Sequence, residues 1–450
     1  MSTLLSRPKR TKSQPTSGPR ADIQGLRTIA VLLVVFDHLL GWPRGGFIGV
    51  DVFFVISGFL ITGSLLHTLE KSGRISFRSF YSRRIRRIVP AATLVLVVTV
   101  IASYFVFSAT RFKETTVDAL WAFLFGANWR FAIEGTDYFN SDSALSPLQH
   151  YWSLSVEEQF YFVWPAVILA IGVITTRRSW SRRARLRLSA ATMGVVIAAS
   201  FIYAVVDTAD NPTWAYFSTF TRVWELGVGA LLAIGISWLE RIPNVLRPMI
   251  SWAGILMIAV GAFVITETGG GFPAPWAVLP VVGAALIIGA GVAGEREYIP
   301  VLTNRASVYI GDISYSLYLW HWPVIVLLAT VIDVDIYFYV GALLLMFALS
   351  IGCYHGFENP IRLSNWLTSN AEHSDLKALK KSRWRLHAVK KLDRPAQRIG
   401  TDLPRGFRTM EMTIFRPRSR AAGNCSGRRS GIGTRALNVD DAGCRSLRCT

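Results

Sequence analysis

The stretch that decides the fold is residues 80–108, which read FYSRRIRRIVPAATLVLVVTVIASYFVFS. Four arginines at its start are followed, from Ile88 onward, by 21 residues without a charged side chain. A helix of about 20 apolar residues crosses the roughly 30 Å hydrocarbon core of a bilayer. Lys and Arg gather at the cytoplasmic end of such helices. The stretch is therefore predicted to be a membrane span that enters from the cytoplasm.

Composition extends this prediction to the whole 450-residue chain. Hydrophobic residues make up 51% and charged residues only 17%, with a mean hydropathy of +0.36. Soluble domains carry about 25% charged residues, so a soluble or disordered chain is excluded, and four cysteines are too few for a disulfide scaffold. We predict an all-α polytopic bundle of about ten transmembrane helices, at residues 26–42, 47–66, 88–108, 156–175, 188–206, 217–238, 249–267, 276–293, 308–331 and 335–356.

One further apolar segment, residues 117–131, is predicted to be re-entrant or interfacial. Asn128 and Arg130 interrupt it. A full crossing here would also move the arginine-rich loop 176–187 to the outside, against the preference of basic residues for the cytoplasm. With this segment excluded from the count, both termini are cytoplasmic.

The net charge of +19 belongs to the two ends of the chain. Residues 1–20 carry +5, residues 363–450 carry +12, and the apolar body between them carries only +2. Neither end shows the folded basic face that nucleic-acid binding needs, so no nucleic-acid partner is expected. We divide the chain into a basic tail at 1–21, a membrane domain at 22–362, and a basic cytoplasmic tail at 363–450 that is predicted to be disordered.

Ionisable residues inside the predicted spans indicate a functional site, because charge is costly at bilayer depth. Arg27 and His38 are eleven residues apart, which places them on one face of the first span about 16 Å apart. Arg27 could instead anchor the helix at the interface, and His38 could be a packed histidine. Asp51 lies in the second span and needs a partner.

Two later stretches add candidate residues. Residues 152–161 read WSLSVEEQFY, with Ser155, Glu157 and Tyr161 near the mouth of a span; Glu157 and Tyr161, four residues apart, share a helix face. His321 lies in an aromatic cluster, YSLYLWHWP, where a packing role is the simpler interpretation. Arg222 and Glu225 are expected to form an internal salt bridge.

Arg84 and Arg87 belong to the cytoplasmic run of arginines at a helix entrance. Guanidinium groups in such a cluster bind phosphate bidentately, but they could equally hold the chain on anionic lipid. The sequence has no Walker-type loop, no Cys/His spacing for a metal site, and no Gly-x-Ser-x-Gly elbow. The residues alone leave a membrane enzyme, a transporter or flippase, and a non-catalytic scaffold open.

Seven motifs in order resemble the membrane-bound acyltransferase family 3, over about residues 22–362. They are Arg27-x(10)-His38, residues 49–59 (GVDVFFVISGF), Arg84-x-x-Arg87, residues 152–159 (WSLSVEEQ), residues 224–226 (WEL), residues 318–323 (YLWHWP) and residues 358–362 (ENPIR). The resemblance implies O-acylation, most commonly acetylation, of a hydroxyl on a bacterial envelope glycan or glycolipid, in a multi-pass protein of the inner (plasma) membrane. Many relatives also carry an outer esterase-like domain, for which we see no counterpart here.

The resemblance also implies roles for the candidate residues. A cytoplasmic acyl-coenzyme A would be the co-substrate, bound through Arg27, Arg84 and Arg87, with no bound cofactor. His38 would act as general base, with Glu157 as our expected partner; an acyl-histidine intermediate remains open. Asp51 completes the expected catalytic set, and Tyr161, His321 and Ser155 are the expected supporting residues.

Overall fold

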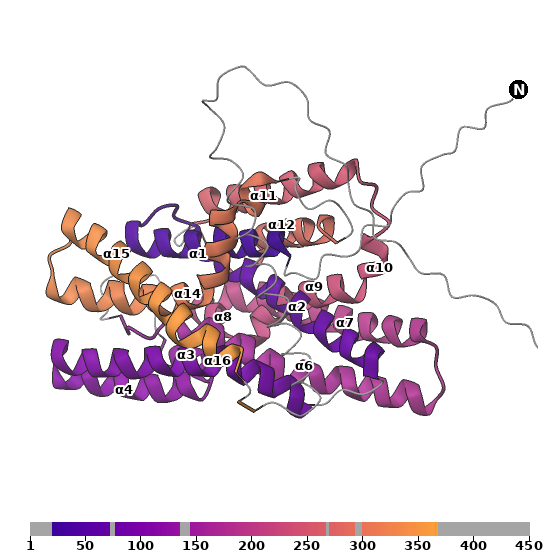
Figure 1. Cartoon of the computed structure of the whole chain (residues 1–450), viewed down its shortest axis with the longest axis horizontal. Helices are drawn as coiled ribbons and strands as arrows, with labels where there is room; N and C mark the ends of the chain where they lie inside the picture. The colour runs from indigo at the N-terminus through magenta and orange to yellow at the C-terminus, as the bar shows by residue number, and fades with distance from the viewer. Residues whose placement is uncertain are drawn as a thin grey trace, which may run out of the picture. The chain divides into compact units, whose positions relative to one another are not determined.

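The computed structural model describes residues 20–72, 77–135, 145–266, 270–292, 299–364 and 366–367, and within these ranges the regular elements are helical, with no strand (Figure 1). The longer helices there are α1 (Ala21–Leu40), α2 (Gly49–Ser72), α3 (Phe77–Val106), α4 (Ala109–Phe123), α6 (Tyr151–Arg177), α7 (Arg182–Asp210), α9 (Thr219–Ile234), α11 (Leu246–Val264), α12 (Val278–Ala290), α14 (Arg305–Val331) and α15 (Ile336–Cys353). The shorter ones are η1 (Gly46–Ile48), α5 (Ala127–Glu134), α8 (Pro212–Phe217), α10 (Ile236–Leu239), α13 (Pro300–Thr303), η3 (Tyr354–Glu358) and α16 (Asn359–Arg362).

The predicted all-α membrane bundle is confirmed. In the described part of the chain, nine helical segments are long and apolar enough to cross a membrane. They correspond to nine of the ten predicted spans; the tenth, at residues 276–293, contains α12, a shorter apolar helix of 13 residues. The tail prediction for residues 363–450 falls almost wholly outside the described residues.

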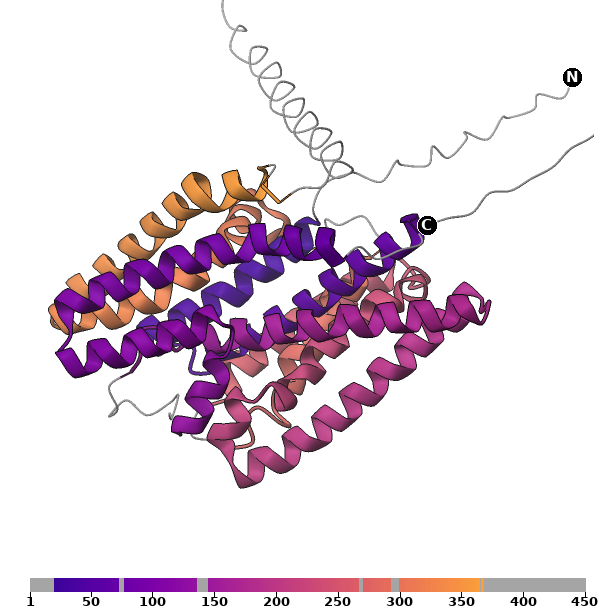
Figure 2. The same ribbon diagram turned by 90° about the horizontal axis from the view of Figure 1, so that it is seen from below.

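Burial separates central helices from peripheral ones. In the most apolar window of each helix, 72% of the α2 segment is buried inside the protein, against 22% for α7. Figure 2 shows the long helices running side by side in one bundle. The apolar side chains exposed on α7 and α11, such as Val195 and Leu256, are those expected to contact lipid.

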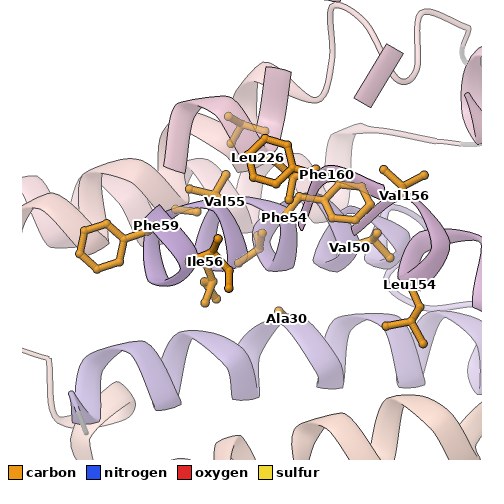
Figure 3. Close-up of a cluster of buried hydrophobic side chains, with 14 of the residues drawn as sticks. Ala30, Val50, Phe54, Val55, Ile56, Phe59, Leu154, Val156, Phe160 and Leu226 are labelled. Atoms are coloured by element: carbon orange, nitrogen blue, oxygen red, sulfur yellow. The ribbon is translucent and has the colours of Figure 1, made fainter. Parts of the chain in front are cut away.

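Helix α2 is the centre of the packing. It contacts α1, α6, α9 and α12. Figure 3 shows Phe54, Val55 and Phe59 of α2 among side chains of the neighbouring helices. The α2–α9 crossing is close because both helices contribute glycine: a Cβ at Gly58 would lie 1.9 Å from the backbone oxygen of Leu226. Small residues at a crossing let backbones approach, which is how membrane helices gain packing energy.

The segment predicted to be re-entrant or interfacial, residues 117–131, forms the end of α4 and most of α5. The Ser108 hydroxyl accepts a hydrogen bond from the Arg111 backbone N–H and so caps α4, which packs against α3. Helix α5 follows after a short turn and packs against α6 and α8. Neither α4 nor α5 is among the nine candidate spans.

A methyl group at the α2–α9 crossing should separate the two helices. We expect Gly58→Ala to lower the free energy of unfolding by about 1–3 kcal/mol, the usual cost of overpacking. Thermal unfolding of the protein in detergent would measure this. Gly194→Ala in α7 is the matched control, because nothing lies within 4 Å of a Cβ there. Equal effects of the two substitutions would contradict the close crossing.

Candidate functional site

A cavity lies between α1, α2, α3, α6 and α14, and three arginines line it. Its volume is about 790 Å³, measured to its open mouth. Its polar lining consists of Arg27, Ser57, Arg84, Arg87, Ser153, Glu157, Tyr161, Ser314, Tyr315 and Tyr318. The three residues expected to bind the donor therefore line one hollow, although they come from two helices. We call this hollow the arginine cavity.

The carboxylate in the arginine cavity, Glu157, is held by its own neighbours. Both Ser57 and Tyr161 donate hydroxyl hydrogen bonds to its Oε1. The Arg84 guanidinium lies 3.8 Å from Glu157 and 3.4 Å from Glu158, and its central carbon is 3.3 Å from the centroid of the Tyr161 ring. The ion pairs with the two glutamates and the contact with the Tyr161 ring together fix the orientation of Arg84.

Arg27 and Arg87 supply the remaining charge of the cavity. The Arg27 Nη1 donates to Gln24 at 3.0 Å, and the Gln24 amide in turn donates to Asp312 at 2.5 Å. The lining of the cavity thus contains three guanidinium groups and one carboxylate, that of Glu157. A surplus of positive charge in a partly enclosed hollow favours an anionic ligand.

Three histidines lie together beside the cavity. His38 Nδ1 is 3.0 Å from His321 Nε2, and the two rings stack with centroids 5.2 Å apart. His321 Nδ1 is 2.5 Å from the Tyr318 backbone oxygen. The His150 ring lies 5.5 Å from the His321 ring, and its Nε2 is 3.1 Å from the Leu319 backbone oxygen. Helices α1 and α14 and the residue before α6 contribute these side chains.

The backbone oxygen of Tyr318 determines which nitrogen of each ring carries a proton. A carbonyl oxygen only accepts, so His321 Nδ1 must donate to it. In neutral His321 the other nitrogen, Nε2, then accepts, and His38 Nδ1 must be its donor. Neutral His38 therefore carries its basic lone pair on Nε2. If both rings were protonated, two N–H groups would oppose each other, so no more than one of the pair is charged.

Tyr318 separates the arginine cavity from the histidines. Its side chain lines the cavity, and its ring lies 5.3 Å from the ring of His321. The hydroxyl lies 2.6 Å from the Ser153 hydroxyl and donates to the His150 backbone oxygen at 3.0 Å. His38 is not among the residues that line the cavity. One aromatic side chain thus lies between the arginine cavity and the chain of imidazoles that His38 and His321 form.

Comparisons with known proteins identify the family of the chain. A family model described as an acyltransferase domain matches residues 20–355, about three quarters of the chain. The chain belongs to this acyltransferase family. The match includes all nine residues expected to form the site and every histidine of the cluster. No solved structure is a significant match.

Curated members of the family are similar to the chain over the same region. Peptidoglycan O-acetyltransferase OatA of Listeria monocytogenes is 31% identical over 357 residues, covering 77% of this chain and 56% of the relative. Putative peptidoglycan O-acetyltransferase YrhL of Bacillus subtilis is 33% identical, covering 76% and 54%, and O-acetyltransferase OatA of Staphylococcus aureus is 31% identical, covering 76% and 57%. The chain spans about half the length of these relatives.

One expected pairing differs from the one that the structure forms. Glu157 was expected to orient His38, but its hydrogen bonds come from Ser57 and Tyr161, and the acceptor beside His38 Nδ1 is His321. The cause is helix phase: Glu157 and Tyr161 are one turn apart on the face of α6 that lines the arginine cavity.

Asp51 was expected in the catalytic set, yet the structure pairs it with Arg222 at 2.9 Å. Arg222 also contacts Glu225 at 3.1 Å and donates to the Tyr216 backbone oxygen, with 1% of its side chain exposed. This buried group joins α2 to α9 and does not line the arginine cavity. The expected Arg222–Glu225 salt bridge forms, and Asp51 belongs to the same cluster. Ser155, an expected supporting residue, is also outside the cavity and donates to the Tyr151 backbone oxygen.

Several site residues escaped the sequence analysis. His150 lies two residues before the start of the WSLSVEEQ motif, and Tyr318 is the first residue of the YLWHWP motif. A search around those motifs could therefore have found both. Ser57 lies in the motif at 49–59, but only the fold brings it to Glu157. Contacts between helices far apart in the chain leave no local spacing signal.

The buried cluster of Arg222, Asp51 and Glu225 should contribute more to the free energy of unfolding than an exposed ion pair does. We expect Arg222→Met to cost about 3–5 kcal/mol of unfolding free energy, because it leaves buried carboxylates without their cation. Arg182→Met is the matched control: its ion pair with Glu70 is exposed and is expected to contribute about 0–1 kcal/mol. Urea or thermal unfolding in detergent would measure both. A small effect at Arg222 would mean that the cluster does not hold α2 against α9.

Proposed function

We propose that this protein is a membrane O-acetyltransferase that moves an acyl group, most commonly acetyl, from cytoplasmic acyl-coenzyme A to a hydroxyl of a cell-envelope glycan or glycolipid. The observation that carries the proposal is the imidazole chain from His38 to the Tyr318 carbonyl, one aromatic ring away from the arginine cavity, in a chain of the acyltransferase family. The relatives' names point to peptidoglycan as the acceptor.

The arginine cavity suits coenzyme A, which carries several phosphate groups. Arg27, Arg84 and Arg87 would bind the phosphates through charge-assisted hydrogen bonds. The thioester would then lie toward Tyr318 and Ser153, at the end of the cavity that adjoins the histidines. Because coenzyme A esters are cytoplasmic, this assigns the arginine end to the cytoplasm and agrees with the predicted cytoplasmic termini and a bacterial plasma membrane location.

The chemistry that follows is a direct acyl transfer. The acceptor oxygen attacks the thioester carbonyl carbon while its proton passes to His38 Nε2. The new C–O bond forms, the C–S bond breaks, and the thiolate of coenzyme A takes the proton back from His38. His321 acts as a positioning residue: its Nε2 accepts the His38 Nδ1 hydrogen bond and so holds the basic nitrogen in the tautomer that the reaction needs.

Loss of the imidazole at position 38 should abolish transfer. We expect His38→Ala to lower kcat by about 10²–10⁴-fold, the range of general-base contributions. Coenzyme A release from acetyl-coenzyme A, in the presence of a glycan acceptor and purified protein, is the measurement. An unchanged melting temperature would show that the bundle is intact. Full activity of this variant would contradict the general-base role.

The positioning role of His321 has its own control pair. His321→Gln keeps an acceptor oxygen for His38 Nδ1, whereas His321→Ala does not. We therefore expect His321→Ala to lower kcat with little change in the KM for acetyl-coenzyme A, and His321→Gln to retain more of the activity. Equal losses in both variants would argue for a packing role.

The phosphate contacts can be tested separately from the chemistry. Arg87→Met should raise the KM for acetyl-coenzyme A by about 10–100-fold, the equivalent of losing one hydrogen bond to a charged group. Transfer from acetyl-pantetheine, which lacks the nucleotide and its phosphates, should not change. Arg83→Met is the matched control, since Arg83 lies one helical turn away and does not line the cavity. Equal effects on both donors would exclude Arg87 as a phosphate ligand.

A further inference from the structure

A second charged hollow lies at the opposite end of α3 from the arginine cavity. Arg84 and Arg87 are near the start of α3, whereas this cleft adjoins the first turns of α4, which begins three residues after α3 ends. Its volume is about 820 Å³, measured to its open mouth. It is lined by Arg111, Glu114, Thr115, Asp118, Arg130, Phe131, Glu134, Leu145 and Ser146. We call it the α4–α5 cleft.

The charged side chains of the α4–α5 cleft are held in place. Arg130 binds Asp118 at 3.2 Å and Glu134 at 2.6 Å. The Arg111 guanidinium donates to the Leu145 backbone oxygen at 3.1 Å, and its central carbon lies 3.7 Å from the centroid of the Phe107 ring. Asp118 is 5% exposed, and burial raises the pKa of its carboxyl group. Ordered donors and acceptors thus stand side by side in one polar hollow.

The charges in this cleft select for a neutral ligand. Two arginines face three carboxylates, so the lining lacks the cationic surplus that a phosphate polymer would need. A sugar hydroxyl both donates and accepts hydrogen bonds, and therefore matches a lining in which guanidinium donors alternate with carboxylate and carbonyl acceptors. The chemistry fits a neutral, hydroxyl-rich saccharide.

The cleft is connected to the imidazole chain through one tryptophan. The Trp322 indole N–H donates to the backbone oxygen of Ser146, a lining residue, at 2.9 Å. The same indole ring contacts the His38 ring edge to face, with ring centroids 4.6 Å apart. His38 therefore lies between two hollows: Tyr318 and His321 stand on the side of the arginine cavity, and Trp322 stands on the side of the α4–α5 cleft.

We infer that the α4–α5 cleft is the acceptor subsite, and that it binds a neutral saccharide segment next to His38 on the side opposite to the donor. This inference rests on the proposed function, under which the cleft opens away from the cytoplasm. Arg130, Asp118 and Glu134 would bind sugar hydroxyls, and Trp322, which contacts both Ser146 and His38, would lie at the end of the cleft nearest the imidazole. Donor and acceptor would then reach the same histidine from opposite ends of α3.

The test uses the full chain in nanodiscs with chitotetraose, a neutral N-acetylglucosamine tetrasaccharide, as the probe. Binding is measured calorimetrically without any acyl donor, and transfer is measured separately with acetyl-coenzyme A. We expect Glu134→Gln and Arg130→Gln to weaken chitotetraose binding and raise its KM at least 10-fold, with the KM for acetyl-coenzyme A unchanged. Asp333→Asn is the matched control: it removes an exposed carboxylate that does not line the cleft.

The outcomes separate this inference from the proposed function. Saccharide binding that depends on Arg130 but is not followed by transfer would support the cleft and contradict the acetyltransferase. Transfer to chitotetraose with the same acceptor KM in wild type, Arg130→Gln and Glu134→Gln would overturn the cleft alone. Absence of chitotetraose binding to the wild-type protein, or its competitive displacement by poly(glycerol phosphate), would also overturn the inference of a neutral-saccharide site.

Discussion

The buried guanidinium of Arg222 is the group on which the arrangement of the bundle depends. An unpaired cation is expensive inside a membrane, so Arg222 forces its partners to come together. Asp51 on α2 and Glu225 on α9 supply the opposite charge, and the Tyr216 backbone oxygen takes a further donor. The α2–α9 contact fixed in this way sets the face that α2 turns to the arginine cavity, on which Ser57 binds Glu157.

The site built on this frame keeps the three arginines apart from the three histidines. The arginines that line the cavity belong to α1 and α3, and the imidazole chain begins only beyond Tyr318. If the imidazoles lined the same hollow as three arginines, the positive field would oppose protonation of His38. The Tyr318 ring separates the two sets of groups.

The sequence predicted the class of fold and the composition of the site better than its pairings. Periodicity and charge located the spans, since these are local properties of each segment. Arg27, Arg84 and Arg87, which were expected to bind one donor, line one hollow. The predicted partner of His38, Glu157, differs from the one in the structure, His321. Which of the two reaches His38 depends on the rotation of α6 and α14 about their axes. The role of Asp51 was missed for the same reason: its partner lies 171 residues away along the chain.

The position of Tyr318 bears on how a bound thioester would be protected from hydrolysis. A thioester is hydrolysed when water and a base reach it together, and every such event wastes an activated acetyl group. The Tyr318 ring, held by its hydrogen bonds to Ser153 and His150, lies between the arginine cavity and His321. Under the proposed function, this ring would limit the access of water to a bound thioester.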